Sequence, residues 1–322
     1  MANQLASKIW QTIAAYQNII IHRHVIQDYD ALGSSFGLKE LILSAWPNKN
    51  VHVVGETDPR FLLVPESEIL PQDSWQGALV IVCDCNNTGR IDDDNWQHAD
   101  FIIKIDHHED FQPFGDLSWV DTSYVATAEM MIDLYLQGKE TYPLKLSKKA
   151  RLFFYCGILT DTGRFQFVHK AQAARLFAHI EYLVAPGDLS PFDIGNLVYR
   201  YTWNEVQIDG YIKLNFKRPV ERMVYLCITE AVLQEHGWCF DEVRGKVNSM
   251  MGIIGVKVWA LLVERAEEQK IYVELRSNGP VVNTIALKYG GGGHKLASGC
   301  KLDDWQQSEA LLEDLKQAAA EL

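Results

Sequence analysis

The chain has 322 residues, of which 48% are hydrophobic and 22% charged, as is usual for a globular protein with a sizeable core. Its formal net charge of −12 argues against a protein that coats long nucleic acid, although a small phosphorylated substrate could still bind at a locally positive site. No apolar run is long enough to span a bilayer, and the N-terminal segment resembles an amphipathic helix rather than a secretory signal. We therefore expect a cytoplasmic protein of two domains, with its six cysteines as buried thiols.

The first stretch with residues that could bind a ligand or take part in catalysis follows a short buried strand predicted at residues 18–22. It contains His24, Asp28 and Asp30, and a helix is predicted to start directly afterwards. Free backbone N–H groups in the first helical turn, around Ser34, can hold an anion. The alternative is that an aspartate simply caps the helix. Two carboxylates and a histidine within seven residues favour a metal and phosphate site.

Further short strands are predicted at residues 51–54 and 78–82, and the second of them leads to Asp84. An aspartate in this place can also serve an ordinary turn. Alternation along a strand would direct the thiols of Cys83 and Cys85 to the same face of the sheet.

A fourth apolar run, residues 101–105, ends in Asp106, His107 and His108. In an open α/β sheet, ligands bind outside the carboxyl ends of the strands. Two histidines and an aspartate at such a place suit Mn²⁺, Zn²⁺ or Fe. The alternative is a capped strand end with two surface histidines.

A strand is predicted at residues 117–120, and helices are predicted at 122–136, 146–160 and 171–183. The strongly apolar second helix leads to Asp161 in the stretch LTDTGRF. Asp161 therefore follows another buried element, as Asp84 and the aspartate–histidine triplet do.

The second domain begins after a mainly helical connection at residues 191–216. We predict a strand at 223–229, a polar helix at 240–251, and two strands at 256–264 and 270–275. The polar turn between the last two strands is a hairpin signal.

The final motif begins at Arg276 and Ser277 and ends in four glycines, Gly290–Gly293, followed by His294. Successive glycines expose backbone N–H groups and let another molecule come close. A flexible linker is the alternative, but apolar structure continues on both sides of the run. A following helix could start at His294, and a terminal helix is predicted at 305–322.

The candidate metal ligands all follow buried elements, so they can converge at one edge of a sheet. Oxygen-rich ligation with some imidazole suits Mn²⁺ better than Mg²⁺ or Fe²⁺. The set is larger than one catalytic ion usually needs, which favours a pair of ions that act together on a phosphate. The candidates are His24, Asp28, Asp30, Asp84, His107 and Asp161.

Four stretches, HVIQDYDALGS, VIVCDCNNTGRID, IDHHED and LTDTGRF, resemble in order the four motifs of the DHH phosphoesterases. The stretch RSNGPVVNTIALKYGGGGHKLASG resembles the signature of the associated DHHA1 domain. The compact length is similar to that of the NrnA type of this family, whose members are bifunctional oligoribonucleases and pAp phosphatases.

This resemblance implies an α/β fold, with an N-terminal, mostly parallel sheet flanked by helices and a smaller C-terminal α/β domain across a cleft. It implies a DHH catalytic domain at 1–186, a helical linker at 187–216 and a DHHA1 substrate-binding domain at 217–322. Closure of the cleft implies a hinge at 185–191.

By the same resemblance, the metal candidates would hold two Mn²⁺ ions. His24 and Asp28 would belong to one ion, Asp30 and His107 would belong to the other, and both ions would share Asp84 and Asp161.

The remaining site residues would act on the substrate. His108 would meet the scissile phosphate or assist proton transfer, and Asp106 would orient a histidine. The other phosphate or the base would be held by Arg276, Ser277, the backbone of Gly291, Gly292 and Gly293, and His294.

The implied reaction is Mn²⁺-dependent cleavage of RNA of about 2–5 nucleotides to mononucleotides, together with dephosphorylation of pAp to AMP. A phosphodiesterase for linear or cyclic dinucleotides is the main alternative. The glycine-rich ending disfavours an inorganic pyrophosphatase, and a non-catalytic nucleotide sensor would be expected to have lost ligands. The resemblance allows a homodimer, and the sequence leaves the oligomeric state open.

Overall fold

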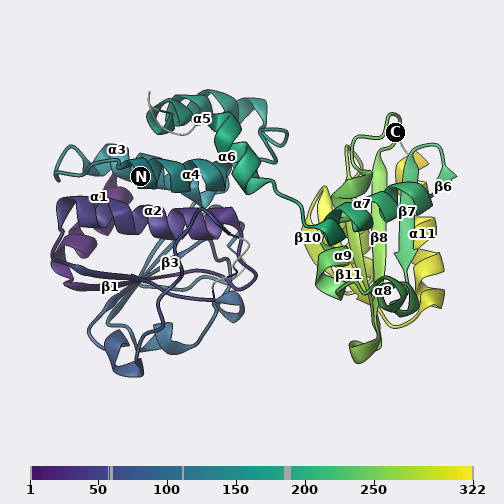
Figure 1. Cartoon of the computed structure of the whole chain (residues 1–322), viewed down its shortest axis with the longest axis horizontal. Helices are drawn as coiled ribbons and strands as arrows, with labels where there is room; N and C mark the ends of the chain where they lie inside the picture. Colours follow the sequence, from purple (N-terminus) through teal and green to yellow (C-terminus); the bar gives the residue numbers. More distant parts are fainter. Residues whose placement is uncertain (1, 57, 59–60, 111, 185–189, 321–322) are drawn as a thin grey trace. The chain divides into compact units, whose positions relative to one another are not determined.

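The computed structural model describes residues 2–56, 58, 61–110, 112–184 and 190–320. The chain divides into two compact units, Met1–Arg200 and Tyr201–Leu322 (Figure 1). The domain limits expected from the sequence stay a prediction, and the expected hinge at 185–191 lies mostly outside the described residues. None of the described helices is both long and apolar enough to cross a membrane.

The N-terminal unit is built on a five-stranded sheet in which all neighbouring strands run parallel, in the order β2-β1-β3-β4-β5. This arrangement confirms the predicted parallel sheet. The carboxyl ends of β1, β3 and β4 therefore meet at one edge, and the polar residues that follow them are brought together. The strands are β1 (Asn18–His22), β2 (Asn50–Val53), β3 (Leu79–Cys83), β4 (Phe101–Asp106) and β5 (Leu117–Val120).

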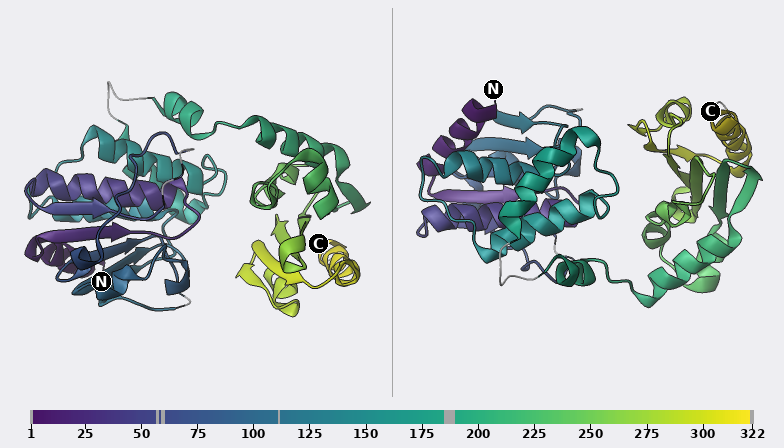
Figure 2. Two further views of the ribbon diagram at one scale, coloured as in Figure 1. Left: turned by 60° about the horizontal axis from the view of Figure 1, so that its bottom comes forward. Right: turned by 90° about the horizontal axis from the view of Figure 1, so that it is seen from above.

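Helices cover one face of this sheet, and α4 packs against both α2 and α3 (Figures 1 and 2). The main core lies between these helices and the sheet. The helices are α1 (Ala2–Ala15), α2 (Tyr29–Ala45), α3 (Thr127–Gly138), α4 (Lys148–Asp161), α5 (Lys170–Leu183) and α6 (Pro191–Val198).

The other face of the sheet is covered by loops and three short 3₁₀ helices, which enclose a smaller core around Trp75 and Trp96. Cys83 belongs to the main core and Cys85 to this smaller one, so the expectation of a shared face is wrong. The strand ends at Cys83, and Asp84 takes a left-handed φ of +58°, which breaks the alternation. The 3₁₀ helices are η1 (Gln72–Trp75), η2 (Thr88–Arg90) and η3 (Asn95–His98).

The C-terminal unit has a six-stranded mixed sheet in the order β10-β11-β9-β8-β7-β6. The predicted hairpin is confirmed as the antiparallel pair β8 and β9. The strands are β6 (Lys217–Val220), β7 (Met223–Ile228), β8 (Val258–Arg265), β9 (Lys270–Ser277), β10 (Gly292–His294) and β11 (Ala297–Leu302).

Two cores lie on opposite faces of this sheet, because the side chains of each strand alternate between them. One core includes α10 (Asn283–Lys288) and α11 (Trp305–Ala320). The other is covered by α7, α9 and η4, and it shows that the polar helix expected at 240–251 is broken in two. The elements on this side are α7 (Trp203–Asn215), α8 (Glu230–His236), α9 (Phe240–Arg244) and η4 (Val247–Met250), and η5 (Ala266–Glu268) joins β8 to β9. Cys239 on this side is exposed, so not all six thiols are buried.

The last two glycines of the run belong to β10, which ends at His294 and pairs with β11 in a tight hairpin, so no helix starts at His294. A Cβ atom on Gly291 would lie 2.1 Å from the carbonyl oxygen of Gly299. Gly293 has a φ of +128°, and its Cβ atom would lie 2.7 Å from the carbonyl oxygen of Ala297. The missing side chains therefore allow β10 to approach β11 closely.

Candidate functional site

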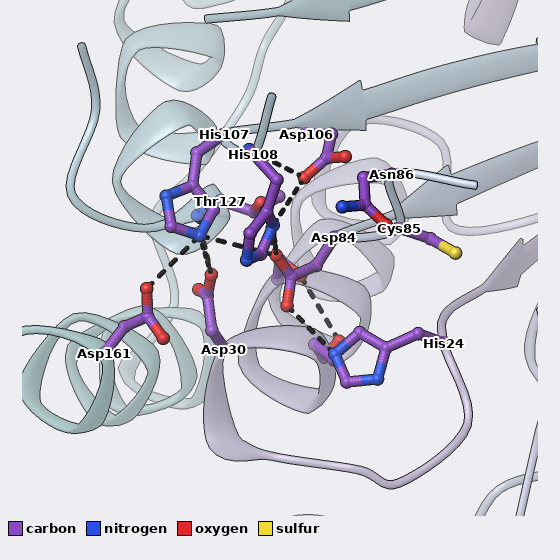
Figure 3. Close-up of polar contacts among 12 residues, drawn as sticks. His24, Asp30, Asp84, Cys85, Asn86, Asp106, His107, His108, Thr127 and Asp161 are labelled. Atoms are coloured by element: carbon purple, nitrogen blue, oxygen red, sulfur yellow. Dashed lines mark hydrogen bonds and ion pairs between the residues drawn. The ribbon is translucent and has the colours of Figure 1, made fainter. Parts of the chain in front are cut away.

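The carboxyl edge of the N-terminal sheet brings together all six residues predicted as metal ligands. Figure 3 labels His24, Asp30, Asp84, His107 and Asp161 among them. His24 follows β1, Asp84 follows β3 and His107 follows β4. The others come from helices that pack over the same edge: Asp28 caps α2, Asp30 lies in its first turn, and Asp161 is the last residue of α4.

The first group consists of His24, Asp28 and Asp84. The Nε2 atom of His24 lies 3.5 Å from an oxygen of Asp28 and 3.3 Å from one of Asp84. Its Nδ1 atom lies 2.6 Å from the carbonyl oxygen of Val25, which fixes the ring and leaves Nε2 directed at the carboxylates. A histidine held through one nitrogen and facing carboxylates with the other is arranged as a metal ligand.

The second group consists of Asp30, His107 and Asp161. The Nε2 atom of His107 lies 3.7 Å from Asp30 and 3.2 Å from Asp161, and also 3.7 Å from Asp84. This nitrogen is buried and makes no hydrogen bond within the described part of the chain. A buried ring nitrogen surrounded by three carboxylates fits the donor set of a divalent cation.

Asp84 connects the two groups, because one of its oxygens faces His24 and the other faces His107. It is almost completely buried and has a left-handed backbone, a conformation that costs a residue other than glycine about 1–2 kcal/mol. The hydroxyl of Thr127 donates to Asp84 over 3.0 Å. Strain and burial of this kind are concentrated at functional sites, and here they direct the carboxylate to the site.

Asp30 is held by the N-terminus of α3. The backbone N–H groups of Thr127 and Ala128 donate to its two oxygens over 2.7 and 2.8 Å. Free N–H groups at a helix N-terminus stabilise an anion, and each oxygen keeps a further lone pair for a cation. The sequence did not indicate Thr127 or Ala128, because their partner lies almost one hundred residues earlier in the chain.

A buried polar network holds the start of α3 in place. Glu129 accepts a hydrogen bond from the backbone N–H of Val125 over 2.9 Å. Its other oxygen lies 2.9 Å from Nε of Arg175 and 3.2 Å from Nδ1 of His179, both on α5. The second nitrogen of His179 lies 3.2 Å from Asp133. The helix that holds Asp30 is therefore fixed to its neighbour by charged pairs.

Two glycines allow α2 and α4 to pack closely enough to bring Asp30 and Asp161 into one group. A Cβ atom on Gly33 would lie 2.3 Å from the carbonyl oxygen of Phe153. A Cβ atom on Gly157 would lie 2.9 Å from Oδ1 of Asp30 and 2.7 Å from the Cβ atom of Ala128. Gly157 therefore sets the distance between the two helices and α3.

His108 is positioned by Asp106, as the sequence led us to expect. One oxygen of Asp106 lies 2.9 Å from Nδ1 of His108 and accepts its backbone N–H over 3.1 Å. Lys104 is fully buried under this turn, with its ammonium nitrogen 2.6 Å from Asp110 and 4.0 Å from Asp106. Lys104 was missed because an isolated lysine in an apolar strand gives no sign of its partners.

Close packing of these groups changes their pKa values. Burial lowers the pKa of His24, but hydrogen bonds to Asp28 and Asp84 outweigh this effect and raise it to about 10. Similar balances, with burial opposed by nearby carboxylates, raise the pKa of His107 to about 9 and that of His108 to about 10.

The pKa values of the buried carboxylates of Asp84 and Asp30 shift in opposite directions. Burial alone would raise the pKa of Asp84, but hydrogen bonds from His108 and His24 hold it well below its usual value. Burial, with the nearby charges of Asp84 and Asp161, raises the pKa of Asp30 well above its usual value. Without cations, protons on the imidazoles balance the carboxylates, and cation binding must release protons.

Ser34, expected to present a free N–H group to an anion, is placed differently. Helix α2 starts at Tyr29, two residues earlier than expected, so Ser34 lies beyond the first turn that carries free N–H groups. Its side chain is fully buried, and its hydroxyl donates to the carbonyl oxygen of Ala31 over 3.2 Å. Ser34 is therefore a packing residue.

The predicted substrate-binding residues of the C-terminal unit lie around the β10–β11 hairpin. Arg276, on β9, donates through Nη1 to its own strand at Leu275 over 2.8 Å, while its Nε and Nη2 atoms have no hydrogen bond among the described residues. The hydroxyl of Ser277 is buried and donates to the carbonyl oxygen of Pro280, so it stabilises the turn after β9. His294 is exposed.

Two parts of the chain match known domain families: residues 18–158 match the "DHH family, N-terminal domain" and residues 222–321 match the "DHHA1 domain". The bifunctional oligoribonuclease and PAP phosphatase NrnA of Bacillus subtilis is 37% identical over 97% of this chain and 98% of its own length. The cyclic-di-AMP phosphodiesterase GdpP of Geobacillus thermodenitrificans is 24% identical over 96% of this chain but 48% of its own length.

A solved structure has the same fold throughout. An exopolyphosphatase-related protein from Bacteroides fragilis superposes with a TM-score of 0.81, at 24% identity, over 98% of this chain and 95% of that one.

Proposed function

Since the chain belongs to the DHH family of phosphoesterases, we propose that it is a Mn²⁺-dependent hydrolase that cuts short oligoribonucleotides to mononucleotides and converts pAp to AMP. The observation that carries this proposal is the pair of ligand groups joined through Asp84 at one sheet edge. The activity for which the Bacillus relative is named supports the choice of substrates, because that relative matches nearly the whole chain.

The two ligand groups would hold two cations. His24, Asp28 and Asp84 form one group, and Asp30, His107 and Asp161 form the other. Mixed carboxylate and imidazole ligands favour Mn²⁺, with Mg²⁺ or Fe²⁺ as weaker candidates. Such a pair, when bound, supplies positive charge to the phosphate oxygens and lowers the pKa of water. A second role of Asp161, as a ligand shared by both cations, stays a prediction.

Proton transfer is the proposed role of His108. Asp106 holds its Nδ1 atom at 2.9 Å, which leaves Nε2 for the phosphate or the leaving oxygen. The pKa of about 10 means that the imidazole carries a proton at neutral pH before cations bind. A protonated His108 would stabilise negative charge that develops on the phosphate.

The proposed substrate contacts in the C-terminal unit are made by Arg276, His294 and the glycine hairpin. The Nε and Nη2 atoms of Arg276, which make no hydrogen bond with any described residue, form one edge of its guanidinium, and this edge suits a phosphate group. Gly292 is the one residue of Gly291–Gly293 at which a Cβ atom would meet nothing within 4 Å among the described residues. Its bare backbone is therefore open to a ligand.

The test is Mn²⁺-supported hydrolysis of a 5′-labelled RNA trimer and of pAp by the same preparation. Hydrolysis of both supports the proposal. Hydrolysis of pAp alone would reduce the proposal to a nucleotide phosphatase.

A second candidate is a phosphodiesterase for linear or cyclic dinucleotides, which the likeness to GdpP favours. Linear pApA, pGpG and cyclic di-AMP belong in the same assay. Cleavage of these dinucleotides without cleavage of the trimer or pAp would replace the first proposal by the second.

A further inference from the structure

The face of the C-terminal sheet that carries Arg276 also has an area without large side chains. Residues directly paired in neighbouring antiparallel strands direct their side chains to the same face. Strand pairing forms two adjacent rows on this face: His294, Ala297 and Arg276 form one, and Gly292, Gly299 and Glu274 form the other. Three small residues therefore lie between His294 and the pair formed by Arg276 and Glu274.

A second arginine reaches the same place from α9. The Nε atom of Arg244 lies 2.7 Å from one oxygen of Glu274, and the other oxygen of Glu274 lies 3.4 Å from Nη1 of Arg276. The guanidinium carbon of Arg244 lies 4.8 Å from the ring centre of Tyr272, the residue that precedes Glu274 on this face. One carboxylate thus holds two guanidinium groups, and an aromatic ring supports one of them.

The two arginines keep donors for a ligand. Within the described residues, only Nε of Arg244 and only Nη1 of Arg276 have hydrogen bonds. The side chains are 39% and 25% exposed, so the unused N–H groups are accessible to solvent. Two guanidinium charges against one carboxylate leave this spot positive in a chain of net charge −12. Its chemistry fits a dianionic phosphate group.

We propose that Arg244 is a phosphate-binding residue that acts with Arg276 on the terminal phosphomonoester of the substrate that is not cleaved, while Glu274 holds both guanidinium groups in place. This inference rests on the proposed function for its substrates. Arg244 lies outside both the RSNG and the GGGGH stretches, and its sequence neighbourhood gives no sign of the role. The proposal makes Arg244 a determinant of specificity for substrates with a terminal phosphate.

The experiment compares pApA with ApA, which lacks the 5′-phosphate, in Arg244→Gln and the unaltered protein. We expect KM for pApA to rise about tenfold or more, as for loss of one charge-assisted contact, with kcat and all constants for ApA unchanged. Arg244→Lys keeps the charge but loses the planar fork, so it should recover only part of the loss. An equal change for both substrates, or no change, overturns the proposal.

Arg218→Gln is the matched control. Arg218 is exposed on β6, which forms the edge of the same sheet opposite to β10, and its guanidinium donates to the carbonyl oxygen of Glu221. The substitution removes the same charge from the same unit without touching Tyr272 or Glu274, so it should leave KM for pApA unchanged. If Arg218→Gln raises KM as much as Arg244→Gln does, a general charge effect explains the result and the proposal fails.

A binding measurement separates this inference from the proposed function. Titration calorimetry of pAp with metal-free protein does not depend on turnover. About tenfold weaker binding by Arg244→Gln supports the inference even if the unaltered protein hydrolyses neither RNA nor pAp, a result that would overturn only the proposed function. Equal binding by the two proteins overturns the role of Arg244.

Discussion

The two candidate binding regions are built on opposite physical principles. At the sheet edge of the N-terminal unit, buried carboxylates and imidazoles hold one another within about a hydrogen-bond distance before any ligand arrives. The other region is the face of the C-terminal sheet that carries Arg276 and the β10–β11 hairpin, called here the hairpin face. Its important features are exposed guanidinium donors and missing side chains. The first region depends on the side chains that are present, and the second depends largely on bare backbone. Substitutions should therefore affect them in different ways.

The largest effect is expected for Asp84→Ala. Asp84 belongs to both ligand groups, so its loss should lower kcat at saturating Mn²⁺ by about 10³-fold or more, in line with loss of a principal catalytic group. Steady-state kinetics of protein checked for folding by circular dichroism would measure it. Retention of most activity by the metal-loaded variant would falsify the two-cation proposal.

Gly157→Ala should disturb the same region without removing a ligand. The added methyl group would lie 2.9 Å from Asp30 and 2.7 Å from Ala128, so α2, α3 and α4 must separate. We expect about 1–3 kcal/mol lower stability and a loss of activity of about tenfold to a hundredfold. Thermal unfolding and kcat measure the two effects.

The control for Gly157→Ala is Gly210→Ala in α7, where a methyl group meets nothing within 4 Å among the described residues. Alanine in a helix is favoured over glycine by about 0.5–1 kcal/mol, so this variant should be neutral or slightly more stable. Unchanged activity and stability of Gly157→Ala would show that the helices adjust freely.

The hairpin face can be tested with two adjacent glycines. Gly293→Ala should destabilise the C-terminal unit, because its φ is +128° and its methyl group would meet β11 at 2.7 Å. Gly292→Ala should leave thermal stability unchanged and raise KM for short RNA by about tenfold, since the methyl group would take space proposed for the ligand. A normal KM for the Gly292 variant would contradict a substrate role for that backbone.

The smallest effect concerns stability alone. Burial lowers the pKa of His179, but its hydrogen bonds to Asp133 and Glu129 prevail and raise it from 6.5 to about 9. A raised folded-state pKa stabilises the protein below pH 6.5, and this contribution is lost as the pH rises through about 9. His179→Gln should therefore unfold more easily by about 2 kcal/mol at pH 6, and the deficit should shrink toward pH 9.5.

Urea unfolding of the metal-free proteins at several pH values measures the deficit of His179→Gln. The exposed His98 offers a control, and His98→Gln should follow the unaltered protein at every pH. A deficit that does not vary with pH would mean that packing, rather than charge, accounts for the role of His179.

The sequence by itself determined the parallel sheet and most of the candidate metal ligands at its edge. Apolar runs that end in His24, Asp84 and His107 can be placed at one edge, because the carboxyl ends of parallel strands meet there. The hairpin of β8 and β9 was equally visible, since its polar turn lies between two apolar runs. These features are local patterns combined with one general rule of topology.

Only the tertiary structure decided which groups meet across long stretches of chain. The amides of Thr127 and Ala128 reach Asp30, Lys104 supports the turn of Asp106, and Arg244 shares Glu274 with Arg276. Ser34 lies beyond the free N–H groups because the helix starts two residues earlier than expected, and a pattern of apolar residues does not resolve that difference. Such contacts depend on how helices pack and rotate, and side-chain partners far apart in sequence leave no local signal.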